Sequence, residues 1–166
     1  QGMDESNINH ILNITIVDDF LNKREISADS PSKYMKKFAR INKEIKNAKA
    51  KKPASIIVKV NSLSDAALIQ KLAEAAIAGV EVKLIVRGIF CPILENKKFK
   101  HPVQAISIVD EYLEHARVLI FHNGGNEKIF SSSADWMVRN LDHRVEAAIP
   151  IIDTNIQQEL KDIIHI

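Results

Sequence analysis

Apolar and polar positions alternate along the chain in a way that predicts short buried strands separated by amphipathic helices. Residues 56–60 form a β-branched run, which is typical of a strand covered on both faces. Residues 66–78 have a helical composition, with Ser64 as the predicted N-cap and Gly79 as the stop signal. Residues 82–86 form the next apolar strand. A strand, a helix and a strand in this order predict a parallel pair joined by a right-handed crossover.

The N-terminal part carries a different pattern. Residues 7–21 are mildly apolar and fit either a helix or a strand. Ser30 is a predicted N-cap, and Pro31 suits the first position of the helix that follows. Apolar residues at spacings of three and four then predict a long amphipathic helix before Pro53; they are Tyr34, Phe38, Ile41, Ile45 and Ala48.

The C-terminal half predicts a hairpin and several shorter elements. The turn signal of the hairpin is Asn123-Gly124-Gly125. In chain order, we expect a strand at 103–108, a short helix at 109–113, hairpin strands at 118–122 and 128–132, a strand at 144–149 and a helix at 155–164. The predicted fold class is therefore α/β, with a mixed β-sheet flanked by helices.

Length and composition limit the possible classes of protein. The 166 residues are 46% hydrophobic, which suits one domain, with or without an extension. The single cysteine, Cys91, excludes an internal disulfide and favours a reducing compartment. No apolar run approaches the roughly 18 residues that cross a bilayer, and no secretory signal is visible. Gln1 and Gly2, which precede Met3, are interpreted as a tag remnant.

Charge is concentrated rather than general, because 23 basic and 21 acidic residues leave a net charge of only +2. Between residues 33 and 52 the only acidic residue is Glu44, and the basic ones are Lys33, Lys36, Lys37, Arg40, Lys43, Lys46, Lys49, Lys51 and Lys52. This face is either simply solvated or an electrostatic guide for a polyanion. Aromatic residues make up only 5% of the chain and do not interleave with these lysines, so we expect no nucleic-acid partner. A second basic cluster at 97–101 is either a mobile flap near the site or a solvated loop.

Three polar residues stand at the ends of apolar strands. Lys59 lies inside a β-branched run, where a buried ammonium group must be paired. Arg87 ends one strand and His115 precedes another. Ligands of open α/β sheets gather at the carboxyl ends of parallel strands. We therefore expect Arg87 and His115 to bind a phosphate, because guanidinium forks onto phosphate oxygens and imidazole exchanges protons with them.

The neighbourhood of His115 contains further groups that suit a phosphate. Small polar residues at 131–135 allow a ligand close to the backbone, and basic and amide groups follow. The supporting candidates are Lys59, Asn61, Arg117, Ser132, Asp135, Arg139, Asn140 and Arg144. The histidines show no spacing typical of metal ligands, so we predict no metal site.

These motifs resemble a known superfamily. His115-x-Arg117, followed by Ser132-Ser133-Ala134-Asp135, is similar to the H-x-K and G-S-x-N motifs of the phospholipase D superfamily. Arg117 stands in place of the lysine, and His122 stands where an aspartate is expected. A closer resemblance is to the C-terminal part of bacterial polyphosphate kinase, a phospholipase-D-like relative, and it is carried by residues 52–65, 78–91, 104–125 and 132–151.

The resemblance implies a domain organisation. Residues 1–2 would be the tag remnant, and residues 3–50 the tail of the preceding domain with a connecting helix. Residues 51–166 would be the phospholipase-D-like C-terminal catalytic domain. The remaining domains of the enzyme would lie outside this fragment.

The resemblance also implies a reaction. Such a kinase reversibly transfers the terminal phosphate of ATP to polyphosphate through a phosphohistidine, which would belong to a missing domain. Arg87 and His115 match ATP-binding positions, and His115 would be catalytic. Mg²⁺ is expected in the full-length enzyme, with its ligands outside this chain. The family implies a homo-oligomer located in the cytoplasm, with peripheral membrane association as a variant.

Two alternatives remain open. One is a phosphodiesterase of the phospholipase D type that pairs two copies of His115 in a homodimer. The other is a non-catalytic domain that binds polyanions through the lysine-rich helix. Under the kinase interpretation, the isolated fragment is expected to have little or no activity, because it holds half of the active site.

Overall fold

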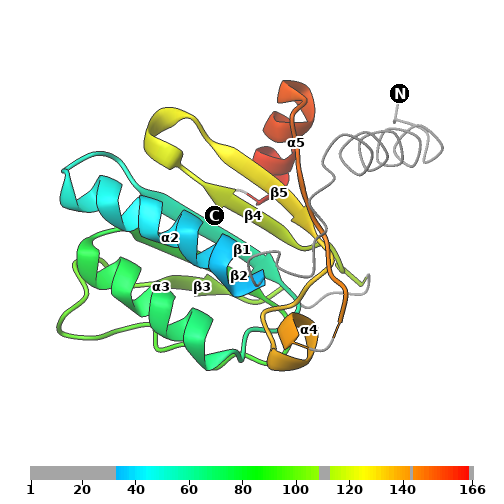
Figure 1. Cartoon of the computed structure of the whole chain (residues 1–166), viewed down its shortest axis with the longest axis horizontal. Coiled ribbons are helices and arrows are strands. Elements are labelled where there is room, and N and C mark those ends of the chain that lie inside the picture. The colour runs from blue at the N-terminus through cyan, green and yellow to red at the C-terminus, as the bar shows by residue number, and fades with distance from the viewer. Residues whose placement is uncertain (1–32, 109–112, 143, 165–166) are drawn as a thin grey trace. The chain divides into compact units, whose positions relative to one another are not determined.

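The computed structural model has a mixed sheet of six strands in the order β3-β2-β1-β4-β5-β6. Figure 1 shows helices packed on this sheet. The structure describes residues 33–108, 113–142 and 144–164. Its elements are α2 (Lys33–Lys49), β1 (Ser55–Val60), α3 (Ala66–Ala78), β2 (Glu81–Val86), β3 (Gln104–Ile106), β4 (Val118–Phe121), the 3-10 turn η1 (Asn123–Gly125), β5 (Lys128–Ser132), α4 (Val138–Asp142), β6 (Ala148–Pro150) and α5 (Thr154–Ile164). The predicted class, a mixed sheet flanked by helices, is confirmed.

Strand β1 is central and has a different neighbour on each side. It pairs in parallel with β2, as the strand–helix–strand pattern predicted, and antiparallel with β4. β2 continues the parallel part to β3, whereas β4, β5 and β6 are antiparallel. The end of β1 therefore lies beside the end of β2 and beside the beginning of β4.

Two hydrophobic clusters hold the helices to opposite faces of the sheet. The larger one joins α2 and α3 to alternate residues of β1, among them Ile56 and Val58, and Figure 1 shows these two helices side by side across that face. The smaller cluster includes Ile57 of β1 and Ile164 of α5. Lys59 shares the face of Ile57, because side chains alternate along a strand. No helix in the described part of the chain is long and apolar enough to cross a membrane.

The ends of several predicted elements are corrected. The N-cap of α3 is Asp65 rather than Ser64: the Asp65 carboxylate accepts from Leu68 N at 2.9 Å. Gly79 does end the helix, at a φ of 100° that favours glycine. The last strand begins at Ala148, four residues later than predicted, and directly before it Ser133 Oγ accepts from Ala147 N at 3.0 Å.

Other expectations are missed or lie outside the description. The short helix α4 carries too little periodicity to have been predicted. The predictions for 7–21, for Ser30 and Pro31, and for most of 109–113 fall outside the described residues.

One buried acid fixes α2 to the hairpin turn. Glu44 is 1% exposed, and its Oε1 accepts from Asn123 N at 2.6 Å. Its Oε2 has no hydrogen-bond partner among the described residues. Burial raises the pKa of Glu44, and the hydrogen bond from Asn123 opposes that shift only in part.

Glu44→Gln should flatten the dependence of folding stability on pH. A folded-state pKa above the unfolded value of about 4.3 means that the folded chain holds this proton more tightly. The contribution of Glu44 to folding stability is then fully present below about pH 4.3, and it is lost as pH rises through the folded-state pKa. A glutamine oxygen keeps the bond to Asn123 and has no proton to lose, so the free energy of unfolding should fall less as pH rises. Urea unfolding at several pH values measures how the free energy of unfolding changes with pH. The control is Glu74→Gln, which replaces an exposed acid paired with Lys71 and should give the wild-type slope. Equal slopes for Glu44→Gln and wild type would refute the effect.

Candidate phosphate-binding site

The strand order brings three polar residues to one edge of the sheet. Asn61 follows β1 and Arg87 follows β2, so the parallel pairing places them together. β4 begins where β1 ends, with Val118 opposite Lys59, which delivers His115 to the same edge. Gly88 permits the close approach, because its N–H donates to Asn61 O at 2.7 Å and a Cβ there would lie 2.8 Å from that oxygen.

His115 lies between two guanidinium groups. Its Nδ1 is 3.2 Å from Arg87 Nη2, and its Nε2 is 3.3 Å from Arg117 Nη2. Arg87 is held from behind by a 2.6 Å hydrogen bond from its Nε to Asn61 Oδ1. The Asn61 amide completes the ring of contacts with a longer bond to His115 O, at 3.4 Å. The structure therefore brings together the two residues that the sequence singled out for phosphate.

The contacts of the His115 ring cannot all be hydrogen bonds. Guanidinium carries only donors, and a neutral imidazole has one N–H and one acceptor nitrogen. Whichever nitrogen of His115 carries the proton, that N–H faces a donor of Arg87 or Arg117. A doubly protonated ring would face a donor on both sides. An anion oxygen placed beside the ring N–H would accept from both groups and remove the mismatch.

Arg117 is fixed by a buried carboxylate. Asp135 accepts from Arg117 Nε at 3.0 Å and from Arg117 Nη2 at 3.2 Å. It also accepts the backbone N–H groups of Asn61, at 2.8 Å, and Ser62, at 3.2 Å. Burial alone disfavours the charged carboxylate, but the bonds from Arg117 and Asn61 outweigh it and hold the pKa of Asp135 below its ordinary value.

Lys59 binds the residues on either side of His115. The side chain is buried, and its Nζ lies 2.8 Å from Ala116 O and 3.2 Å from Glu114 Oε1. The hydrogen bond from Lys59 holds the pKa of Glu114 below its ordinary value. The predicted need for a partner of Lys59 is thus confirmed, whereas Glu114 itself was missed. Its position directly before His115 was the only signal in the sequence.

The remaining candidates have other partners or are exposed. Ser132 Oγ accepts from Ala134 N, one residue before Asp135. Asn140 donates to Glu146 Oε1 at 2.9 Å, and Glu146 also contacts Ser133 Oγ, so this group orders the segment beside Asp135. Arg139 and Arg144 are exposed, and among the described residues the side chains that meet the His115 ring are Arg87 and Arg117.

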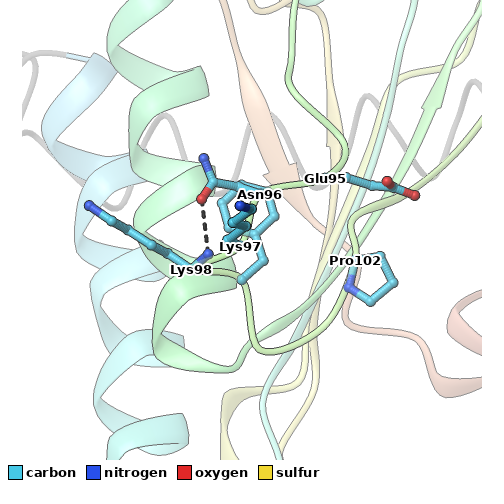
Figure 2. Close-up of a pocket in the computed structure, with 6 residues that line it drawn as sticks. Glu95, Asn96, Lys97, Lys98 and Pro102 are labelled. Atoms are coloured by element: carbon cyan, nitrogen blue, oxygen red, sulfur yellow. Dashed lines mark hydrogen bonds between the residues drawn. The ribbon is translucent and has the colours of Figure 1, made fainter.

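The basic cluster at 97–101 belongs to the opposite end of the sheet. Its loop is closed locally: Asn96 Oδ1 accepts from Lys98 N at 2.9 Å (Figure 2). Lys100 Nζ donates to Ala78 O at 3.0 Å, at the end of α3 that precedes β2. Because Arg87 follows β2, the strand separates this loop from the site. The idea of a flap beside Arg87 is therefore wrong.

The described residues lack a cluster of metal-ligating side chains. They contain no group of three or more His, Cys, Asp or Glu side chains that could hold a metal ion. The Asp135 carboxylate is engaged by Arg117 and two backbone N–H groups. Mg²⁺ prefers several oxygen ligands, so the guanidinium groups around His115 do not fit it.

Comparison with known proteins gives consistent relatives. The family model described as polyphosphate kinase C-terminal domain 2 matches residues 29–166. Polyphosphate kinase of Vibrio cholerae is 47% identical over 126 residues, and that of Escherichia coli K12 is 46% identical over 127; each match covers 76% of this chain and 18% of the relative. The chain thus spans about a fifth of the length of these relatives.

Two solved structures resemble the fold. The crystal structure of polyphosphate kinase from Porphyromonas gingivalis superposes with a TM-score of 0.77 at 36% identity, over 90% of this chain and 24% of that one. NucT from Helicobacter pylori gives a TM-score of 0.53 at 16% identity, over 79% of this chain and 87% of that one. The second likeness concerns the fold alone.

Proposed function

The chain belongs to the family of polyphosphate kinase C-terminal domains, and on this premise we propose that Arg87 and His115 bind the phosphate that such an enzyme transfers. The observation that carries the proposal is the donor mismatch around the His115 ring. A bound phosphate oxygen would accept from the ring and from guanidinium together. Charge-assisted bonds of this kind are stronger than neutral ones.

The proposed reaction is reversible phosphoryl transfer between ATP and polyphosphate. The bond between the γ-phosphorus and the β,γ-bridging oxygen breaks, a bond to a histidine nitrogen in another domain forms, and ADP leaves. A second, similar displacement then passes the phosphoryl group to the end of polyphosphate. Catalysis of such steps is mostly positioning and stabilisation of charge on the equatorial oxygens. Arg87 and His115 would supply that stabilisation, and Asn61 would orient Arg87.

The proposal leaves other parts of the reaction to the rest of the enzyme. Mg²⁺ would be held outside the site described above, together with the phosphohistidine. The other domains of the enzyme, a homo-oligomeric state and peripheral membrane association remain predictions. Use of ATP would place the enzyme in the cytoplasm.

Tripolyphosphate should bind this chain at the His115 site, and Arg87→Ala should weaken that binding by about ten- to a hundredfold. The estimate follows from the loss of a hydrogen-bonding cation, worth about 1.5–3 kcal/mol. Titration calorimetry at several salt concentrations measures the affinity, which should fall as salt rises. The matched control is Lys161→Gln, which removes a half-exposed cation paired with Glu127 and should leave the affinity unchanged.

The same titration separates the alternatives. If the chain is only a polyanion-binding module, Arg87→Ala will bind as well as wild type, whereas replacing the exposed Lys43, Lys46 and Lys49 with glutamine will weaken binding. That result would refute the proposed site. A phospholipase-D-type phosphodiesterase has less support, because His122 replaces the expected aspartate and its Nδ1 accepts from Gly125 N in the hairpin turn.

A further inference from the structure

We propose that Asp135 and Arg117 are positioning residues that hold His115 in one tautomer, with the proton on Nδ1. The ring would then act as a hydrogen-bond donor to a phosphate oxygen shared with Arg87. The tautomer itself follows from contacts within the chain. Only the identity of the bound anion rests on the proposed function.

The two guanidinium groups beside His115 differ in how firmly they are held. Arg117 makes two hydrogen bonds to Asp135, and both side chains are almost covered, at 14% and 10% exposed. Among the described residues, Arg87 is anchored by one hydrogen bond, from its Nε to Asn61, and the residue is half-buried. Arg117 cannot turn away from the ring without breaking a buried ion pair. Arg87 can turn about its one anchor.

The hydrogens of Arg117 Nη2 then assign the ring nitrogens. This nitrogen carries two hydrogens; one points to Asp135 Oδ2 at 3.2 Å, and the other is available to His115 Nε2 at 3.3 Å. Guanidinium only donates, and Arg117 is the group that is fixed beside the ring, so we assign Nε2 as the acceptor nitrogen. The proton of a neutral His115 therefore lies on Nδ1, toward Arg87 Nη2 at 3.2 Å. Two donors thus converge where a phosphate oxygen is proposed to bind.

This assignment limits what His115 does in the reaction. The Nε2 lone pair is engaged by Arg117 and is not available to attack phosphorus. The Nδ1–H group is aimed at the ligand and stabilises charge there. Asp135 acts through Arg117 and touches no ligand itself, in keeping with the partners that often fix the tautomer of a functional histidine.

Long-range ¹⁵N–¹H correlation spectra of the ¹⁵N-labelled chain, without ligand and at a pH where the rings are neutral, distinguish the two tautomers directly. His115 should give the Nδ1–H pattern with at least about tenfold preference, as expected for a charge-assisted bond at Nε2. His122 provides an internal control, because its Nδ1 accepts from Gly125 N at 3.1 Å and it should show the opposite, Nε2–H pattern. An Nε2–H pattern for His115 would overturn the proposal.

Variants test whether the pair causes the preference. Arg117→Met removes the donor to Nε2 and should reduce the preference for Nδ1–H by at least about tenfold. Asp135→Asn keeps an acceptor for the backbone N–H groups of Asn61 and Ser62 but presents an amide to Arg117. It should shift the tautomer of His115 in the same direction. This variant provides the test if Arg117→Met does not fold. Lys161→Gln should have no effect. An unchanged His115 pattern in a folded variant of the pair would refute the proposal, whatever the outcome of tripolyphosphate binding.

Discussion

Replacing His115 with alanine in a full-length polyphosphate kinase that carries this domain should lower the rate of ATP synthesis from ADP and polyphosphate by about 10²–10³-fold. Removal of one preorganised donor from an oxyanion site has an effect of that size, and the Nδ1–H of His115 would be such a donor. Arg87→Ala should fall in the same range. Because both residues would contact one phosphate, the double variant should lose less than the product of the two single effects.

Initial rates of ATP formation measure this loss, with the oligomeric state and thermal unfolding of each variant compared with wild type. Lys71→Gln is a suitable control, since it removes a cation from an ion pair with Glu74 on the surface of α3. A turnover of His115→Ala within about threefold of wild type would contradict the proposed role, given the much larger loss expected of an essential donor.

Asp135→Ala should reduce the free energy of unfolding of the chain by about 3–5 kcal/mol, the range observed when one partner of a buried ion pair is removed. The variant leaves the Arg117 guanidinium, only 14% exposed, without its carboxylate. It also removes the acceptor for the backbone N–H groups of Asn61 and Ser62. Urea unfolding monitored by circular dichroism gives the change in stability.

A second substitution shows whether the loss comes from the unpaired charge. Adding Arg117→Leu to Asp135→Ala should recover part of the stability, because a buried ion pair can often be replaced by apolar side chains. In wild type the pKa of Asp135 is held low by Arg117, so this acid stabilises the fold above about pH 3.9 and that contribution is lost as pH falls through its folded pKa. Asp135→Ala should lack this acid-dependent component. A loss below about 1 kcal/mol would mean that the pair is not the anchor proposed above.

The sequence predicted the central part of the fold because local and global signals agree there. The β-branched run of β1, the helix that ends at Gly79 and the strand β2 follow the predicted order, and the phospholipase-D-like fold class is confirmed. The choice between Ser64 and Asp65 as N-cap was not available from the sequence, since both residues suit that position. The structure shows that the Asp65 carboxylate is the group that accepts from Leu68 N, while the backbone N–H groups of both residues donate to Trp136 O.

The site was predictable to the extent that it depends on strand ends. Arg87 and Asn61 follow parallel neighbours, so their proximity is a property of the strand–helix–strand unit. The contacts of His115 and the pairing of Lys59 with Glu114 depend on the antiparallel register of β1 and β4, which no local pattern specifies. The bond between Asp135 and Arg117 likewise joins residues across the β4–β5 hairpin.

One phosphate is proposed to lie between Arg87 and the Nδ1 side of His115. The most direct test is a titration of the ¹⁵N-labelled chain with tripolyphosphate, monitored at the histidine rings and the arginine Nε–H groups. We predict saturable shifts at His115 Nδ1 and at the Arg87 Nε–H, with the ring of His122 unchanged at the far end of β4. Saturable binding that leaves the His115 ring unaffected would contradict phosphate binding between Arg87 and His115.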